Sequence, residues 1–164
     1  MKLELLNGND FKQRIVAGQA NLEKHFEYVN ELNVFPVPDG DTGTNMNLTF
    51  TSGKDAVLES ESEHVGEIGK ILSKGLLMGA RGNSGVILSQ LFRGFTKEIE
   101  SVESVDARRF GQAFQGGVDA AYKAIMKPVE GTILTVARES AKAGIKAAET
   151  QNDIIQVMTA VREA

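Results

Sequence analysis

Apolar residues return every three or four positions through most of this 164-residue chain. That spacing marks one face of an α-helix. We expect the first helix to begin after Asn9 or Asp10, either of which could serve as its N-cap. Its apolar positions are Phe11, Ile15, Leu22, Phe26 and Val29. No alternating run of apolar and polar residues, the pattern of a half-buried strand, appears at any length, so the pattern predicts an all-α fold.

The same period continues in six later segments, separated by short polar stretches. Their apolar positions run from Met46 to Leu58, Val65 to Leu76, Val86 to Ile99, Phe110 to Ile125, Ile133 to Ile145 and Ile154 to Val161. The acidic residues 59–63 interrupt the pattern and indicate a solvated loop. Glycines inside these segments cost helix stability relative to alanine, so they predict close contacts between helices. They are Gly66, Gly69, Gly116 and Gly117.

The sequence NVFPVPDGDTGTN, residues 33–45, lies between the first two expected helices. Its two prolines restrict the backbone, and its glycines allow a tight turn. Asp39 and Asp41 are hard oxygen ligands two residues apart, a spacing that suits Mg²⁺. Gly43, Thr44 and Asn45 follow where a helix N-terminus presents free N–H groups to an anion. The segment therefore predicts a metal and phosphate site, although a capped turn in which Asp41 or Thr42 merely closes the helix N-terminus has similar residues.

A second glycine-rich turn, GARGNSG, covers residues 79–85 and runs directly into a helical pattern. Its glycines, Gly82 and Gly85 among them, allow close approach of a ligand to the backbone. Asn83 and Ser84 offer an N-cap and donors for phosphate oxygens, and Arg81 adds a positive charge. The turn lacks the Gly-Lys-Ser/Thr ending of a Walker A loop. A tight interhelical turn without a ligand remains the alternative.

A third turn, MKPVEGTILT, covers residues 126–135 and places Thr132 at the expected N-cap of the next helix. Three junctions between loop and helix thus share one composition. We expect them to converge at one end of a helical bundle, where their N-terminal dipoles would jointly favour a polyanion.

The amino-acid composition limits the kinds of partner that the protein is expected to bind. The formal net charge is −4 with acidic and basic residues interspersed, so neither a nucleic-acid footprint nor a polybasic membrane anchor is indicated. Cysteine is absent, which excludes disulfides and thiolate chemistry. The N-terminus lacks a signal-peptide pattern, and no apolar run approaches the length of a membrane span. We expect a soluble cytoplasmic protein without direct membrane insertion.

The combination of PVPDGDTGTNMN, GARGNSG and KPVEGT resembles the nucleotide-binding domain shared by bacterial fatty acid kinase and the ADP-binding subunit of dihydroxyacetone kinase. The resemblance covers nearly the whole chain and is closer to the fatty acid kinase branch. It implies an antiparallel helical barrel over residues 1–164 that binds ATP with two Mg²⁺ ions. The γ-phosphoryl group would pass to the carboxylate of a fatty acid held by a partner binding protein, giving an acyl phosphate.

The resemblance also assigns residues. Asp39 and Asp41 match two of three metal-binding aspartates of the dihydroxyacetone kinase branch, and the third falls at or near Asn33, a neutral and weaker ligand. Met126 lies where an apolar side chain would flank the adenine. Independently of the resemblance, the charge of Arg81 makes it a candidate stabiliser of the transferring phosphoryl group beside the catalytic aspartates Asp39 and Asp41. The remaining residues on nucleotide-contact motifs are Gly43, Thr44, Asn45, Gly82, Asn83, Ser84, Gly85 and Thr132.

We expect a last helix that begins after Asn152 as its N-cap, and its apolar pattern stops at Ala164 without a glycine cap or polar tail. The resemblance predicts a further helix, a later glycine-rich nucleotide loop and additional domains, and it leaves a homodimeric full-length protein open. A carboxylate acceptor has a pKa of about 4.3 and is ionised at neutral pH, so it needs no general base. Two other functions stay open: a dihydroxyacetone-kinase-like subunit and a nucleotide-binding regulatory module without turnover.

Overall fold

The computed structural model describes all residues from 1 to 164. Seven helices carry the fold, and the expected all-α class is confirmed. Their bounds are α1 Gly8–Glu31, α2 Thr42–Leu58, α3 Val65–Met78, α4 Gly82–Ile99, α5 Ala107–Ala124, α6 Ile133–Ala148 and α7 Ile154–Glu163. None of these helices is both long and apolar enough to cross a membrane.

Two short strands accompany the helices, so the prediction of no strand was wrong. β1 (Leu5–Asn7) pairs antiparallel with β2 (Ser104–Asp106), and Leu6 lies opposite Val105 with both side chains buried. Three residues are too few to show a period of two in the sequence. The pairing joins the beginnings of α1 and α5, which directly follow the two strands.

Each strand ends in the residue that caps the next helix. Asn7 caps α1, accepting a hydrogen bond from the Asp10 N–H at 2.8 Å, while the Asp10 carboxylate accepts from the Asn7 N–H. This reciprocal arrangement is a capping box. The expected caps Asn9 and Asp10 were therefore wrong by two or three residues. Asp106 caps α5 in a similar way through the Arg109 N–H.

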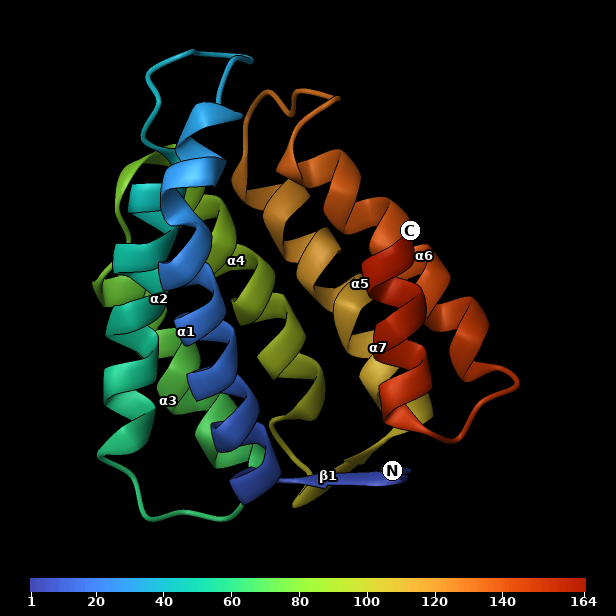
Figure 1. The fold of residues 1–164 in the computed structure, drawn as a ribbon. Helices are drawn as coiled ribbons and strands as arrows, with labels where there is room; N and C mark the ends of the chain where they lie inside the picture. The colour runs from blue at the N-terminus through green and yellow to red at the C-terminus, as the bar shows by residue number, and fades with distance from the viewer.

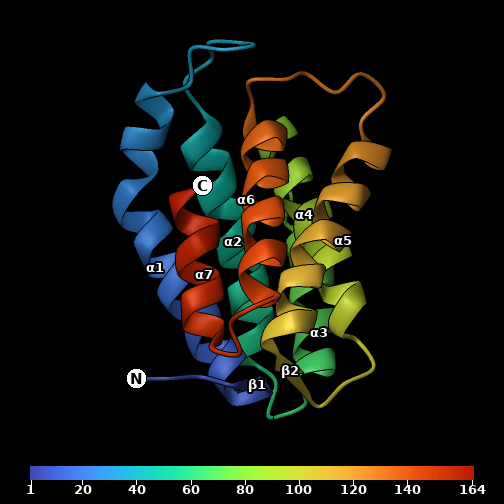
Figure 2. The same ribbon diagram turned by 90° about the vertical axis from the view of Figure 1, so that its right-hand side faces the viewer.

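The helices run alternately up and down, and each packs against the next along the chain (Figure 1). Consequently α2, α4 and α6 all begin at one end of the bundle, where α1, α3 and α5 finish. Figure 2 shows the same arrangement from the side, with the connections at residues 32–41 and 125–132 both at the upper end. The strands and the connections at 59–64 and 149–153 lie at the opposite end.

Glycines allow neighbouring helices to approach closely, as the sequence predicted. A Cβ atom on Gly66 would lie 2.2 Å from the Glu100 carbonyl oxygen, and one on Gly117 would lie 2.5 Å from the Leu91 carbonyl oxygen. Real Cβ contacts are not that short, so only glycine fits these two crossings. The second contact joins α4 to α5 in the middle of the bundle.

The core contains fully buried aliphatic residues of α2 and α3 and a cluster of phenylalanines from α1, α4 and α5. Phe95 lies at its centre, with ring centroids 5.8 Å from Phe110 and 5.2 Å from Phe114 in edge-on contacts. Such aromatic contacts add to the stabilisation from burial. The rings also line an apolar cavity of about 680 Å³ between α1, α4, α5 and α7.

The last helix is tied to the beginning of the chain. Asp153, not the expected Asn152, caps α7, and its Oδ1 accepts the Ile155 N–H and the Leu3 N–H, each at 3.0 Å. The Ile154 N–H in turn donates to the Leu3 carbonyl oxygen at 2.7 Å. Asp153 is 7% exposed, and its cap joins segments 150 residues apart in the sequence.

Candidate functional site

The three polar turns lie at the same end of the bundle, which confirms the predicted convergence (Figure 1). We call them the aspartate loop (residues 32–41), the glycine turn (residues 79–85) and the third loop (residues 125–132). They precede α2, α4 and α6, so the first N–H groups of three helices face this end.

Asn33 shapes the aspartate loop through both ends of its side-chain amide. Its Nδ2 donates to the Val37 carbonyl oxygen at 2.9 Å, and its Oδ1 accepts the Asp41 N–H at 3.3 Å. Gly40 follows with a φ of +66°, a conformation that glycine adopts without strain. The amide therefore closes the loop around the two aspartates, and its role as a metal ligand stays a prediction.

The carboxylates of Asp39 and Asp41 are exposed and form no hydrogen bond or ion pair within the chain. Asp41 occupies the N-cap position of α2, yet its side chain accepts no cap hydrogen bond. A simple capping role for this aspartate is thus not observed. Both carboxylates remain available for a cation at the loop surface, and no third acidic residue or histidine gathers with them.

Asn30 holds the first turn of α2 in place of a cap. Its Oδ1 accepts the Thr44 N–H at 3.0 Å, and its Nδ2 donates to Thr44 Oγ1 at 2.8 Å. Thr44 therefore keeps its hydroxyl proton for another acceptor. Sequence reasoning missed Asn30, because only the packing of α1 against α2 brings it to Thr44.

The glycine turn packs against the beginning of α2. Gly82 has a φ of +59°, and a Cβ atom there would lie 2.4 Å from Asn45 Nδ2. A Cβ atom on Gly85 would lie 2.3 Å from Thr49 Oγ1, which also accepts the Arg81 N–H at 3.0 Å. The turn is thus built to bring its backbone against Asn45 in the first turn of α2.

The helix after the glycine turn begins earlier than expected. Arg81 occupies the N-cap position of α4, so the predicted capping role of Asn83 and Ser84 was wrong. These two residues lie in the first turn instead, with Asn83 exposed and Ser84 half-buried. The Arg81 side chain is exposed and makes no hydrogen bond or ion pair, so its charge is available to an anion.

In the third loop Thr132 caps α6, as predicted. Its Oγ1 accepts the Leu134 N–H at 3.3 Å and donates to the Val129 carbonyl oxygen at 2.7 Å, so its proton is already in use. Met126 is 96% exposed and contributes nothing to the core. A methyl group on Gly131 would lie 3.9 Å from Phe35 Cε1, which places the third loop beside the aspartate loop.

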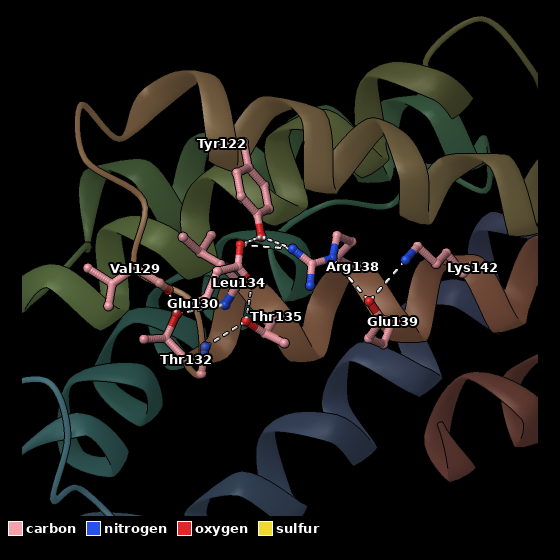
Figure 3. Close-up of polar contacts among 10 residues, drawn as sticks. Tyr122, Val129, Glu130, Thr132, Leu134, Thr135, Arg138, Glu139 and Lys142 are labelled. Carbon is pink, nitrogen blue, oxygen red and sulfur yellow. Dashed lines mark hydrogen bonds and ion pairs between the residues drawn. The ribbon is translucent and has the colours of Figure 1, made fainter.

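Glu130 anchors the third loop to two helices (Figure 3). Its carboxylate accepts from Thr135 Oγ1 at 2.6 Å, from Arg138 Nη1 at 2.8 Å and from Tyr122 Oη at 3.0 Å. The hydrogen bond from Thr135, followed by that from Arg138, lowers the pKa of Glu130 below its usual range. Burial of the Tyr122 hydroxyl, with its bond to Glu130, raises the pKa of that phenol. The sequence pattern gave no signal for this network beyond the acidic residue in KPVEGT.

Fold and loops together define an all-helical domain with polar turns and exposed carboxylates at one end, an arrangement suited to a phosphorylated ligand with a cation. Residues 36–164 match the DAK2 domain, and the chain belongs to this family. Domains of the family bind ADP or ATP, are related to kinases that transfer phosphoryl groups, and work with a partner subunit. The resemblance inferred from the three motifs is thereby confirmed.

Similar proteins occur in species of Staphylococcus and in Bacillus subtilis. The chain is 60% identical over 158 residues to an uncharacterized protein of Staphylococcus saprophyticus, covering 96% of this chain and 29% of that protein. It is 58% identical over 163 residues to protein YloV of Bacillus subtilis, covering 99% of this chain and 30% of YloV. The chain therefore spans about 30% of the length of these curated relatives.

Proposed function

We propose that residues 1–164 form the ATP-binding domain of a two-component fatty acid kinase that acts in the cytoplasm. The acceptor is the carboxylate of a fatty acid held by a partner binding protein. A carboxylate oxygen bonds to the γ-phosphorus, the bond from that phosphorus to the β,γ-bridging oxygen breaks, and ADP leaves with acyl phosphate as product. The observation that carries the proposal is the pair of unpartnered carboxylates, Asp39 and Asp41, beside the first turn of α2.

The donor set at this end fits Mg²⁺. This ion is commonly bound by one or two protein carboxylates, with waters and substrate phosphates in its other positions. Asp39 and Asp41 supply two carboxylates without loss of any internal hydrogen bond, and the Asn33 oxygen lies in the same loop. We propose two ions, with these three residues as the protein ligands. When bound, magnesium neutralises phosphate charge and orients the transferring group.

Local charge also supports a cation. The loops between helices at this end carry the unpaired carboxylates of Asp39 and Asp41 against two basic side chains, those of Arg81 and Lys127, while the Glu130 carboxylate is paired with Arg138. A triphosphate alone would meet a surface with little excess positive charge. A cation bound with the nucleotide offsets the repulsion between the phosphates and the carboxylates of Asp39 and Asp41.

The remaining loop residues orient the phosphates in this proposal. Thr44 has a hydroxyl proton to donate, and the amides of Asn45 and Asn83 are further donors. Backbone N–H groups of Gly43, Gly82 and Ser84 lie at the beginnings of α2 and α4, while that of Gly85 already donates to the Arg81 carbonyl oxygen at 3.0 Å and lets the turn pack closely. Arg81 stabilises charge on the transferring group, while Thr132 and Met126 contact the nucleotide from the third loop. Phosphoryl transfer depends mainly on such positioning and charge stabilisation.

The test is calorimetric titration of the purified protein with a nonhydrolysable ATP analogue, with and without Mg²⁺. Asp39→Asn with Asp41→Asn removes two charges at the loop. Glu59→Gln with Glu61→Gln removes two charges at exposed positions of the opposite end and is the matched control. We expect magnesium-dependent binding that only the aspartate variant loses. Equal binding by both variants would refute the metal site.

Turnover assays separate the possible acceptors. ATP consumption that requires both a fatty acid and its binding protein supports fatty acid kinase. Consumption driven by dihydroxyacetone, a hydroxyl acceptor, would instead identify a dihydroxyacetone-kinase-like subunit. Tight magnesium-nucleotide binding without consumption under either condition would identify a regulatory nucleotide-binding module.

A further inference from the structure

The Glu130 carboxylate points away from the end of the bundle that carries the three polar turns and toward α5 and α6 (Figure 3). Its side chain is 56% exposed, yet it accepts hydrogen bonds from three side chains, those of Tyr122, Thr135 and Arg138. Holding an exposed glutamate in one geometry costs side-chain entropy. A single surface ion pair recovers little of that cost, whereas several bonds that converge on one group fix its position.

Arg138 is committed to this network. Its Nη1 donates to Glu130 and to Tyr122 Oη, at 2.8 and 3.1 Å, and its Nε donates to Glu139 at 3.0 Å. Lys142 also donates to Glu139, at 3.0 Å. The hydrogen bond with Glu130, followed by that with Glu139, raises the pKa of Arg138 above its usual range. Arg138 is therefore held by two carboxylates and is not a free cation for phosphate.

The network reaches the backbone just before α6. Thr135 Oγ1 donates to Glu130 Oε2 and accepts the Gly131 N–H at 2.8 Å. Gly131 has a φ of +78°, directly precedes the N-cap Thr132 and lies beside Phe35 of the aspartate loop. The position of Glu130 thus affects both the start of α6 and the contact between the third loop and the aspartate loop.

We propose that Arg138 and Tyr122 are positioning residues, which act through Glu130 to hold the third loop in the geometry that binds nucleotide. This role rests on the proposed function, because it concerns the same nucleotide site. It assigns α5 and α6 a part in binding through Tyr122 and Arg138, which lie behind the loop and do not touch the ligand.

The experiment measures affinity for the magnesium complex of a nonhydrolysable ATP analogue in four variants of the purified protein. Arg138→Met keeps an unbranched apolar stem but removes both carboxylate contacts, and Arg138→Lys restores the charge. Tyr122→Phe removes one hydroxyl. Lys142→Met is the matched control, because Lys142 lies one turn further along α6 and contacts Glu139 but not Glu130.

We expect Arg138→Met to weaken binding by about tenfold or more, since small displacements of positioning groups have large effects. Arg138→Lys should recover part of the affinity, Tyr122→Phe should show a smaller loss, and Lys142→Met should bind like the wild type. Hydrogen exchange without nucleotide provides a second readout. The Gly131 amide should exchange faster in Arg138→Met while amides of α3 and the unfolding midpoint stay nearly unchanged.

The results distinguish this role from the proposed function. If the wild type binds and Arg138→Met binds equally well, the positioning role is wrong and the proposed function stands. The same conclusion follows if Lys142→Met loses as much affinity as Arg138→Met, or if all amides of Arg138→Met exchange faster together. If the wild type itself binds no magnesium nucleotide, both the proposed function and the positioning role fail.

Discussion

Gly43 in the first turn of α2 offers a sharp test of how the beginning of α2 packs against α1. A Cβ atom at this position would lie 2.0 Å from the Phe26 carbonyl oxygen and 3.0 Å from Asn30 Oδ1. Both atoms belong to α1, and the carbonyl cannot rotate away. Gly43→Ala must therefore push the beginning of α2 off α1, and the Asn30 contacts with Thr44 lengthen at the same time.

The magnitude follows from three effects. Overpacking costs typically about 1 to 3 kcal/mol. Two strained hydrogen bonds cost about 1 kcal/mol each. Alanine in a helix returns up to about 1 kcal/mol relative to glycine. We therefore expect Gly43→Ala to lower the free energy of unfolding by about 2 to 4 kcal/mol, a large part of the roughly 5 to 15 kcal/mol that stabilises a typical domain.

The assay is urea unfolding followed by circular dichroism, with Gly40→Ala as the matched control. Gly40 lies in the aspartate loop just before α2, but a Cβ atom there would have the Asn30 carbonyl oxygen as its nearest neighbour, 4.0 Å away. This control should cost only about 1 to 2 kcal/mol, the penalty of a left-handed backbone with a side chain. Helix propensity alone predicts the opposite for Gly43→Ala, a gain in stability. A variant as stable as the wild type would refute the close contact between α1 and α2.

Two further changes test other parts of the molecule. Asp153→Ala should lower the free energy of unfolding by about 1 to 2 kcal/mol through loss of the α7 cap, while Asp153→Asn keeps an acceptor and most of the stability; equal losses in urea unfolding would contradict the capping role. The pKa of Glu130 is lowered in the folded state, so its contribution is fully present above the usual carboxyl pKa near 4.3 and is lost as pH falls through its lowered pKa. The Gly131 amide should therefore lose protection from hydrogen exchange on acidification in the wild type but not in Glu130→Gln, once the rates are corrected for the intrinsic effect of pH. An equal response in both proteins would argue against Glu130 as the titrating group.

The sequence was sufficient for the parts of the fold that repeat. Long periodic patterns separated by turn residues predicted seven helical segments, their order and the gathering of three polar turns at one end. Thr132 was also correctly predicted as an N-cap. The strands escaped prediction because three residues carry no measurable period. The observed N-caps Asn7, Arg81 and Asp153 differ by one to three residues from the expected ones, since several neighbouring polar residues could each serve as a cap.

The supporting contacts of the candidate site could not be predicted in the same way. Asn30 reaches Thr44 across 14 residues of sequence, and Arg138 reaches Tyr122 across 16. Whether such side chains meet depends on how far two helices are rotated and shifted against each other. Local periodicity leaves that rotation and shift undetermined, so residues on the loops were identified and residues behind them were missed.

The alternating direction of the helices also limits how far the candidate site can act electrostatically. The N-termini of α2, α4 and α6 carry partial positive charge, but the C-termini of α1, α3 and α5 end beside them with partial negative charge. The fields of opposite dipoles that lie side by side largely cancel beyond a few ångströms, and solvent ions screen what remains. The end of the bundle thus attracts an anion at contact distance and steers it weakly from afar. Association of an anionic ligand should consequently depend little on ionic strength, unlike binding at a strongly basic cleft.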